Sequence, residues 1–91
     1  MDRLTAEVNV AYPSHLIAAL EVLDRTLFGE TGYRVFQSDN IPNFLMIEFD
    51  WTNLADARKF WNSKQGEDHI SSWHSVTPLN PPKWSHWLGM P

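Results

Sequence analysis

Apolar and polar residues alternate along the first stretch of the chain, from Arg3 to Tyr12. An alternation with a period of two predicts a β-strand with one apolar face, because successive side chains of a strand point to opposite sides. The apolar positions are Leu4, Ala6, Val8 and Val10. Proline cannot serve a central strand ladder, so the strand is expected to end before Pro13.

The next stretch, His15 to Phe28, has the spacing of an amphipathic helix. Its leucines recur every three or four residues, at Leu16, Leu20, Leu23 and Leu27. Charged residues fall on the other side, so Arg25 is expected to face solvent together with Glu21 and Asp24. Gly29 is expected to end the helix, since glycine adopts the left-handed conformation at a helix end without steric cost.

Two further strands are expected, from Tyr33 to Ser38 and from Phe44 to Trp51, because both segments are rich in β-branched and aromatic residues. The residues between them, 39–43, contain one proline and three Asp or Asn residues, a composition typical of a turn. A link this short predicts an antiparallel hairpin.

A second helix is expected after Trp51, with Thr52 or Asn53 as its cap. Its inner stripe has helical spacing and consists of Leu54, Ala57, Phe60 and Trp61. Residues 64–66 (Lys-Gln-Gly) are expected to interrupt this helix, and a short helical piece is expected from Asp68 to Trp73.

After an irregular segment at 77–82, the alternation from Lys83 to Leu88 predicts a last strand. Trp84 and His86 share one of its faces, and Trp87 lies on the opposite face. Both faces carry a tryptophan, so neither is expected to be freely solvated.

The resulting order is strand, helix, strand, strand, helix, strand. This is the ferredoxin-like βαββαβ plan of the α+β class, expected as a single domain over residues 1–91. So small a domain buries a limited core, and without cysteine it has no disulfides to compensate. We therefore expect a homodimer in which the free sheet faces pack together.

Charge and hydropathy exclude several classes of partner. The net charge is −4, and neither half of the chain has the basic face that phosphate contacts require, so no nucleic-acid partner is expected. No segment approaches the roughly 20 apolar residues of a membrane span. The start of the chain has no signal-peptide pattern, and we expect a cytoplasmic protein. The second half is almost neutral, which favours an uncharged or apolar ligand.

All five tryptophans and three of the four histidines lie between Trp51 and Trp87. His69 and His74 are five residues apart, about 140° around a helix, so they do not form the usual metal pair and no metal site is expected. Trp61 and Trp73 are candidates to line a pocket. The remaining tryptophans are expected in the core or in an interface; these are Trp51, Trp84 and Trp87.

The segment from Phe44 to Ser63, FLMIEFDWTNLADARKFWNS, resembles the antibiotic biosynthesis monooxygenase family of dimeric α/β-barrel proteins. In that family the third strand often ends in a tryptophan. A polar cap and a helix with an aromatic residue or a histidine follow, and then a serine and a further histidine. The matching residues here are Trp51, Phe60, Ser63 and His69. The element order resembles the family over nearly the whole chain.

The resemblance implies a homodimer and a small-molecule enzyme of the cofactor-independent monooxygenase or polyketide cyclase type. Its cavity would lie between helices and sheet and would take a hydrophobic, aromatic substrate without a metal or bound organic cofactor. His69 is the first acid/base candidate and His74 the second. The expected ligand-binding residues are Trp61, Trp73, Phe60 and Asn9.

Three alternatives remain open at this point. The domain could hold a hydrophobic metabolite without catalysis, or it could be a structural dimer without a pocket. It could also resemble the haem-degrading branch, which uses an asparagine on the first strand, a tryptophan on the second helix and a later histidine. Trp61 and His69 or His74 fit the last two positions, whereas Asn9 is displaced by one residue along the strand.

Overall fold

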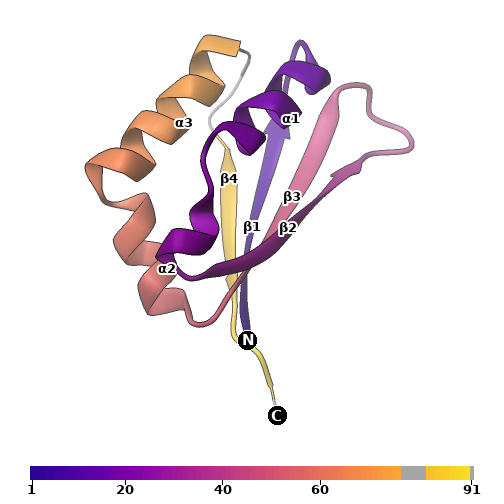
Figure 1. Ribbon diagram of the computed structural model, residues 1–91. Coiled ribbons are helices and arrows are strands. Elements are labelled where there is room, and N and C mark those ends of the chain that lie inside the picture. Colours follow the sequence, from indigo (N-terminus) through magenta and orange to yellow (C-terminus); the bar gives the residue numbers. More distant parts are fainter. Residues whose placement is uncertain (77–81, 91) are drawn as a thin grey trace.

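The computed structural model describes residues 1–76 and 82–90. In the last helix it describes side chains only as far as Trp73. The described residues form four strands, three α-helices and one short 3-10 helix, η1. Figure 1 shows how the strands and α-helices are arranged. The strands are β1 (Asp2–Asn9), β2 (Glu30–Gln37), β3 (Phe44–Trp51) and β4 (Lys83–Trp87). The helices are α1 (Pro13–Val22), η1 (Arg25–Phe28), α2 (Leu54–Trp61) and α3 (Lys64–Val76).

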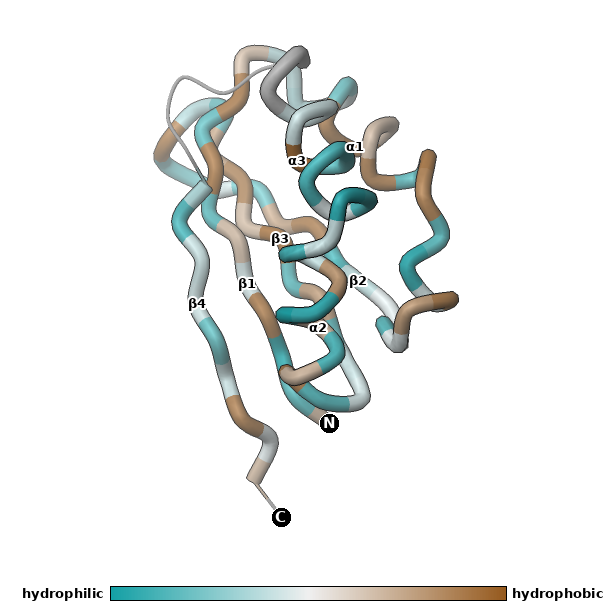
Figure 2. Tube along the Cα trace, turned by 90° about the vertical axis from the view of Figure 1, so that its left-hand side faces the viewer, coloured by the Kyte–Doolittle hydropathy of each residue, from teal (hydrophilic) through white to brown (hydrophobic). Residues whose placement is uncertain are grey.

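The strands form one antiparallel sheet in the order β2-β3-β1-β4. The helices all lie against one of its faces (Figure 2). This arrangement confirms the predicted ferredoxin-like α+β plan. No helix within the described residues is long and apolar enough to cross a membrane.

The core lies between the sheet and the helices, as the alternation along β1 predicts. Its four apolar positions, Leu4, Ala6, Val8 and Val10, are at most 3% exposed. The register pairs Ala6 with Ile47 on one side and with Trp84 on the other, so these three side chains point to the helical face.

The predicted helix over 15–28 is wrong in its second half. The α-helix ends at Val22, and Leu23 has an extended conformation. The Asp24 side chain accepts a hydrogen bond from the backbone N–H of Thr26 and caps the start of η1. Short polar side chains often bind nearby backbone groups in this way, in place of the hydrogen bonds of a continuing helix. Arg25 therefore turns inward and is 1% exposed, where the helical pattern predicts a solvent-facing residue.

The interruption predicted at residues 64–66 is also misplaced. α2 stops one residue before Asn62, and α3 already begins at Lys64. Gly66 lies inside the first turn of α3 because the two helices approach closely there. A Cβ on Gly66 would lie 2.2 Å from the backbone oxygen of Phe60 and 2.7 Å from the Cα of Trp61. This glycine serves packing between helices and does not end a helix.

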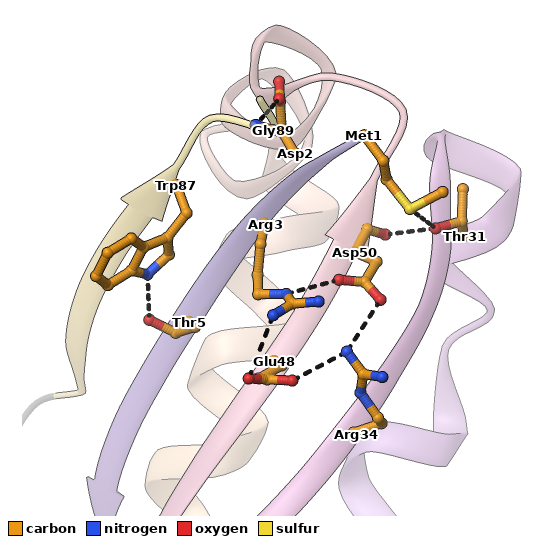
Figure 3. Close-up of polar contacts among 10 residues, drawn as sticks. All are labelled: Met1, Asp2, Arg3, Thr5, Thr31, Arg34, Glu48, Asp50, Trp87 and Gly89. Carbon is orange, nitrogen blue, oxygen red and sulfur yellow. Dashed lines mark hydrogen bonds and ion pairs between the residues drawn. The ribbon is translucent and has the colours of Figure 1, made fainter. Parts of the chain in front are cut away.

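The face of the sheet away from the helices, which we call the open face, is polar at its centre. It carries Arg3, Thr5, Arg34, Phe36, Met46, Glu48, Asp50, Ser85 and Trp87. Arg3 lies 2.9 Å from Asp50 and 3.6 Å from Glu48, and Arg34 lies 3.0 Å from Glu48 and 3.5 Å from Asp50 (Figure 3). Larger apolar side chains flank this network. Phe36 is 45% and Trp87 57% exposed.

Candidate functional site

An aromatic cluster of Phe49, Trp61, Trp73 and Trp84 fills the space between sheet and helices. The Phe49 ring lies 5.3 Å from Trp61, 6.2 Å from Trp73 and 6.3 Å from Trp84, measured between centroids. Trp61 and Trp84 are themselves 5.3 Å apart. Ring contacts of this kind stabilise a core beyond the area that they bury. The cluster brings side chains from β3, α2, α3 and β4 into one group.

A cavity of about 390 Å³ opens beside this cluster, between the helices and the β1–β4 half of the sheet. We call it the helix–sheet cavity. Its lining consists of Leu4, Ala57, Arg58, Trp61, Asn62, Ile70, Trp84 and His86. The walls are apolar and include two indoles, whereas the exposed side chains of Arg58, Asn62 and His86 are polar. The size and the mixture are those of small-molecule pockets.

Next to the aromatic cluster lies a buried polar cluster of Arg25, Glu30 and His69. The Arg25 Nε donates to Glu30 Oε1 at 2.9 Å, and both side chains are at most 3% exposed. One terminal nitrogen of Arg25 donates to the carbonyl oxygen of Leu20 at 2.8 Å and lies 3.1 Å from His69 Nε2. Arg25 thus ties the end of α1, the start of β2 and the middle of α3 together.

The contact with Arg25 determines the state of His69. A guanidinium group can only donate, so His69 Nε2 must accept and the ring proton belongs on Nδ1. Burial, assisted by the charge of Arg25, lowers the pKa of His69 to about 4. His69 is therefore neutral near pH 7. The ring stacks on Trp61 at 5.8 Å with an interplanar angle of 23°.

Burial also acts on Glu30. Its desolvation raises the pKa of this carboxyl above the ordinary value, and the hydrogen bond and charge of Arg25 oppose that rise. Burying the charges of Arg25 and Glu30 costs solvation free energy, and the direct ion pair between the two side chains compensates for this cost.

The structure brings three of the predicted site residues together, since His69, Trp61 and Trp73 contact one another. Of the predicted site residues whose side chains the structure describes, only Trp61 lines the helix–sheet cavity. His69 lies behind it, and Trp73 is 1% exposed within the core. His74 falls in the last turn of α3, where side chains lie outside the described residues.

The two remaining predicted residues do not line the cavity, although the Phe60 ring lies 4.8 Å from that of Trp61. Phe60 is 3% exposed and packs between Phe28, at 4.8 Å, and Trp51, at 5.9 Å. Asn9 pairs with Phe44 at the end of β1, on the open face. Neither residue lines the helix–sheet cavity. The one-residue displacement of Asn9 along the strand has the expected effect of turning its side chain to the other side of the sheet.

Sequence reasoning missed Arg58, Trp84 and His86 as cavity residues. A signal for two of them exists, because the alternation along the last strand places Trp84 and His86 on one face. It does not say that this face meets the helices. Within the described part of the chain, His, Asp and Glu side chains do not gather in groups of three that could hold a metal ion.

Solved structures with this arrangement exist. A candidate antibiotic biosynthesis monooxygenase from Bordetella bronchiseptica superposes with a TM-score of 0.78 at 18% identity, covering 98% of this chain and 96% of that one. SnoaB from Streptomyces nogalater, a cofactor-independent oxygenase, superposes with a TM-score of 0.75 at 9% identity, covering 99% and 93%. This chain has the antibiotic biosynthesis monooxygenase fold.

A conserved protein from Methanosarcina mazei Go1 has the same monooxygenase fold, with a TM-score of 0.74 and 16% identity over 98% of this chain and 92% of that one. No protein-family model and no curated protein matches the sequence. The comparisons confirm, for the fold, the family resemblance found in the sequence. Function has to be argued from the residues of the site.

Proposed function

We propose that this protein is a small-molecule enzyme of the cofactor-independent oxygenase type, which takes a flat hydrophobic substrate into the helix–sheet cavity. The observation that carries the proposal is the cavity itself, with indole rings of Trp61 and Trp84 in its wall. Indoles bind flat aromatic rings well, and the cavity volume of about 390 Å³ lies within the range of small-molecule sites. The fold shared with a cofactor-independent oxygenase supports the same class.

An electron-rich aromatic substrate can reduce dioxygen itself. A ring CH₂ group flanked by phenolic rings loses a proton, and the resulting anion is oxidised by O₂. In the whole reaction CH₂ becomes C=O, one O₂ is consumed and one water is released. The protein would hold the ring against Trp61 and Trp84 and exclude water. The imidazole of His86 and the amide of Asn62, both on the cavity lining, are positioned to hydrogen-bond the substrate oxygen that gains charge.

The acid/base roles of His69 and His74 stay predictions. His69 is neutral near pH 7, and its Nε2 already faces Arg25, so in this proposal it supports Trp61 from behind. The same contact speaks against haem ligation by His69, because the nitrogen that would bind iron accepts a hydrogen bond from a buried cation.

We further propose that two copies associate through their open faces. The exposed rings of Phe36 and Trp87 would be covered, and the half-exposed Arg3 and Arg34 network would be removed from solvent. A hollow of about 500 Å³, lined among others by Arg3, Thr5, Met46 and Trp87, would lie in the interface.

The test is oxygen consumption with a panel of polycyclic phenols and anthrone-like compounds, each also titrated for binding by calorimetry. We expect at least one compound to bind and to be oxidised with one O₂ consumed per molecule. His86→Asn should slow this turnover, whereas His15→Asn should not, since His15 is exposed and contacts only the Tyr12 ring among the described aromatic residues.

The other outcomes decide between the alternatives. A compound that binds and is recovered unchanged would indicate a binding module, and a ring-closed product without oxygen uptake would indicate a cyclase. Unchanged turnover after replacement of both His69 and His74 would remove their predicted catalytic role. Absence of binding by every compound would contradict the proposed use of the cavity.

A further inference from the structure

We infer that the substrate is an aromatic acid, a flat ring system that carries one carboxylate, and that Arg58 selects the anion. The inference rests on the proposed function, since it names the ligand class of the helix–sheet cavity. It differs from the expectation of an uncharged ligand that the nearly neutral second half of the sequence suggests. The charge of the residues that line the cavity determines which ligand binds, and this charge differs from the average over the second half of the chain.

Among the described residues, the lining of the cavity contains one permanent cation, Arg58, and no carboxylate. The chain as a whole has eleven Asp and Glu residues against seven Lys and Arg residues. A carboxylate on the lining would repel an anionic ligand, and none of the described lining residues is Asp or Glu. The sign of the charge at the cavity is therefore opposite to that of the whole protein.

Arg58 also differs from the other three arginines. Arg3 and Arg34 pair with Glu48 and Asp50, and Arg25 pairs with Glu30. Arg58 makes no ion pair with any of the described residues. A guanidinium group has two parallel N–H donors that match a carboxylate, and in Arg58 both remain free for a ligand.

The neighbouring side chains complete a site of mixed character. Trp61 and Trp84 lie 5.3 Å apart at 48° and offer a ring-binding wall. Asn62 follows α2 directly and His86 lies on β4, so polar groups border the cavity from the helical side and from the sheet. An aromatic ring against the indoles places a ring substituent toward the polar side chains. A carboxylate there would form an ion pair with Arg58 through two parallel hydrogen bonds, whereas a neutral amide could accept a hydrogen bond but would form no ion pair.

The experiment compares 2-naphthoate with its neutral counterpart 2-naphthamide by calorimetric titration at low salt. Both have the same ring system and nearly the same shape. We expect naphthoate to bind roughly five- to tenfold more tightly, the range that charge-assisted hydrogen bonds at a partly exposed site give. The preference should shrink as salt is added, because solvent-exposed charges are screened.

Two variants at adjacent positions separate a specific contact from general attraction. Arg58→Gln should abolish the preference for naphthoate over naphthamide. Lys59→Gln removes the same charge from the next exposed residue of α2, which does not line the cavity, and should keep the preference. Arg58→Lys should restore part of it, since an ammonium group offers no fork of two parallel donors.

The outcomes keep this inference apart from the proposed function. Equal binding of both compounds by the unaltered protein would overturn the selection of an anion while the ring-binding cavity stands. Equal loss in the Arg58 and Lys59 variants would overturn the role of Arg58. If neither compound bound, the cavity would not be a binding site for aromatic rings, and the proposed function would fail together with this inference.

Discussion

Arg25 is 1% exposed and contacts residues of α1, β2 and α3 from that buried position. An arginine flanked by Asp24 and Thr26 in a leucine-repeat segment reads as a solvent-facing helical residue. It is instead buried beside Glu30 and under the end of α1. The sequence carries no signal for this, because the reversal depends on an Asp24 side chain that ends one helical pattern and starts another.

Removing Arg25 should therefore be severe. Arg25→Ala leaves the Glu30 carboxyl buried without its cation, and the loss of one partner of a buried pair typically costs about 3–5 kcal/mol of unfolding free energy. Urea denaturation followed by far-ultraviolet circular dichroism measures the loss. Lys64→Ala is the control, since its pair with Asp68 is largely exposed and its removal should leave the midpoint almost unchanged. Equal midpoints for both variants would contradict the buried role of Arg25.

His69 should make stability depend on pH. Its pKa is lowered to about 4 in the folded chain, against an ordinary value of 6.5. Between these values the unfolded chain binds the additional proton, so the free energy of unfolding decreases as the pH falls through this window. The decrease levels off below the folded pKa. The slope approaches about 1.4 kcal/mol per pH unit at most.

The control for this pH dependence is His69→Gln, which removes the titrating ring and keeps a polar side chain. Glu30 acts in the opposite direction, because burial raises its pKa and the folded chain then takes up the proton first. The difference between the unaltered protein and the variant isolates the contribution of His69. Parallel curves of unfolding free energy between about pH 7 and about pH 5 would show that His69 does not titrate as proposed.

Among the helices and strands, alternation predicted the first and last strands, β-forming composition predicted the second and third, and helical spacing predicted the helices less well. The predicted third strand coincides with β3, and the inner stripe of α2 is confirmed at Leu54, Ala57 and Phe60. Alternation succeeds because each strand has one face on a single core. The ends of α1 and α2 were misplaced because capping and packing between helices decide them, and neither follows from hydrophobic spacing.

Gly66 gives the clearest test at the level of helix packing. Gly66→Ala would place a methyl group against the backbone of Phe60 and Trp61, which cannot yield as a side chain would. We expect a loss of about 1–3 kcal/mol in unfolding free energy, as in other overpacked sites. Gly32→Ala is the matched control, because a Cβ at Gly32 meets no atom within 4 Å. If the two variants were equally stable, α2 and α3 would not be held at this distance.

For the whole molecule, the open face determines the assembly that we propose. Sedimentation at micromolar concentration should give a dimer, and Phe36→Lys combined with Trp87→Lys should give a folded monomer. Val22→Lys combined with Leu27→Lys serves as control, since these residues are also exposed and apolar but lie on α1 and η1. A monomeric unaltered protein, or equal dissociation in both double variants, would remove the sheet-to-sheet model.

The candidate site was only partly predictable at this scale. Helical spacing was enough to predict Trp61 as a pocket residue, because the inner apolar stripe of α2 faces the space between helix and sheet where the cavity lies. Arg58 and His86 could not, since their place on the cavity depends on how α2 and β4 meet in space. The indole of Trp84 was expected in the core or in an interface, and it packs against the core on the helical side. Its place on the cavity did not follow, because a strand pattern tells which residues share a face and not which element covers that face.

The alternation along β4 links the proposed ligand site in the helix–sheet cavity to the proposed dimer interface on the open face. Trp84 and His86 point into the cavity, whereas Ser85 and Trp87, one position away, lie on the open face. In the proposed assembly, β4 would therefore contact the ligand with one face and the second subunit with the other. Any ligand that displaces this wall must change the dimer dissociation constant, and dimerisation must change ligand affinity by the same factor, because thermodynamic coupling is reciprocal.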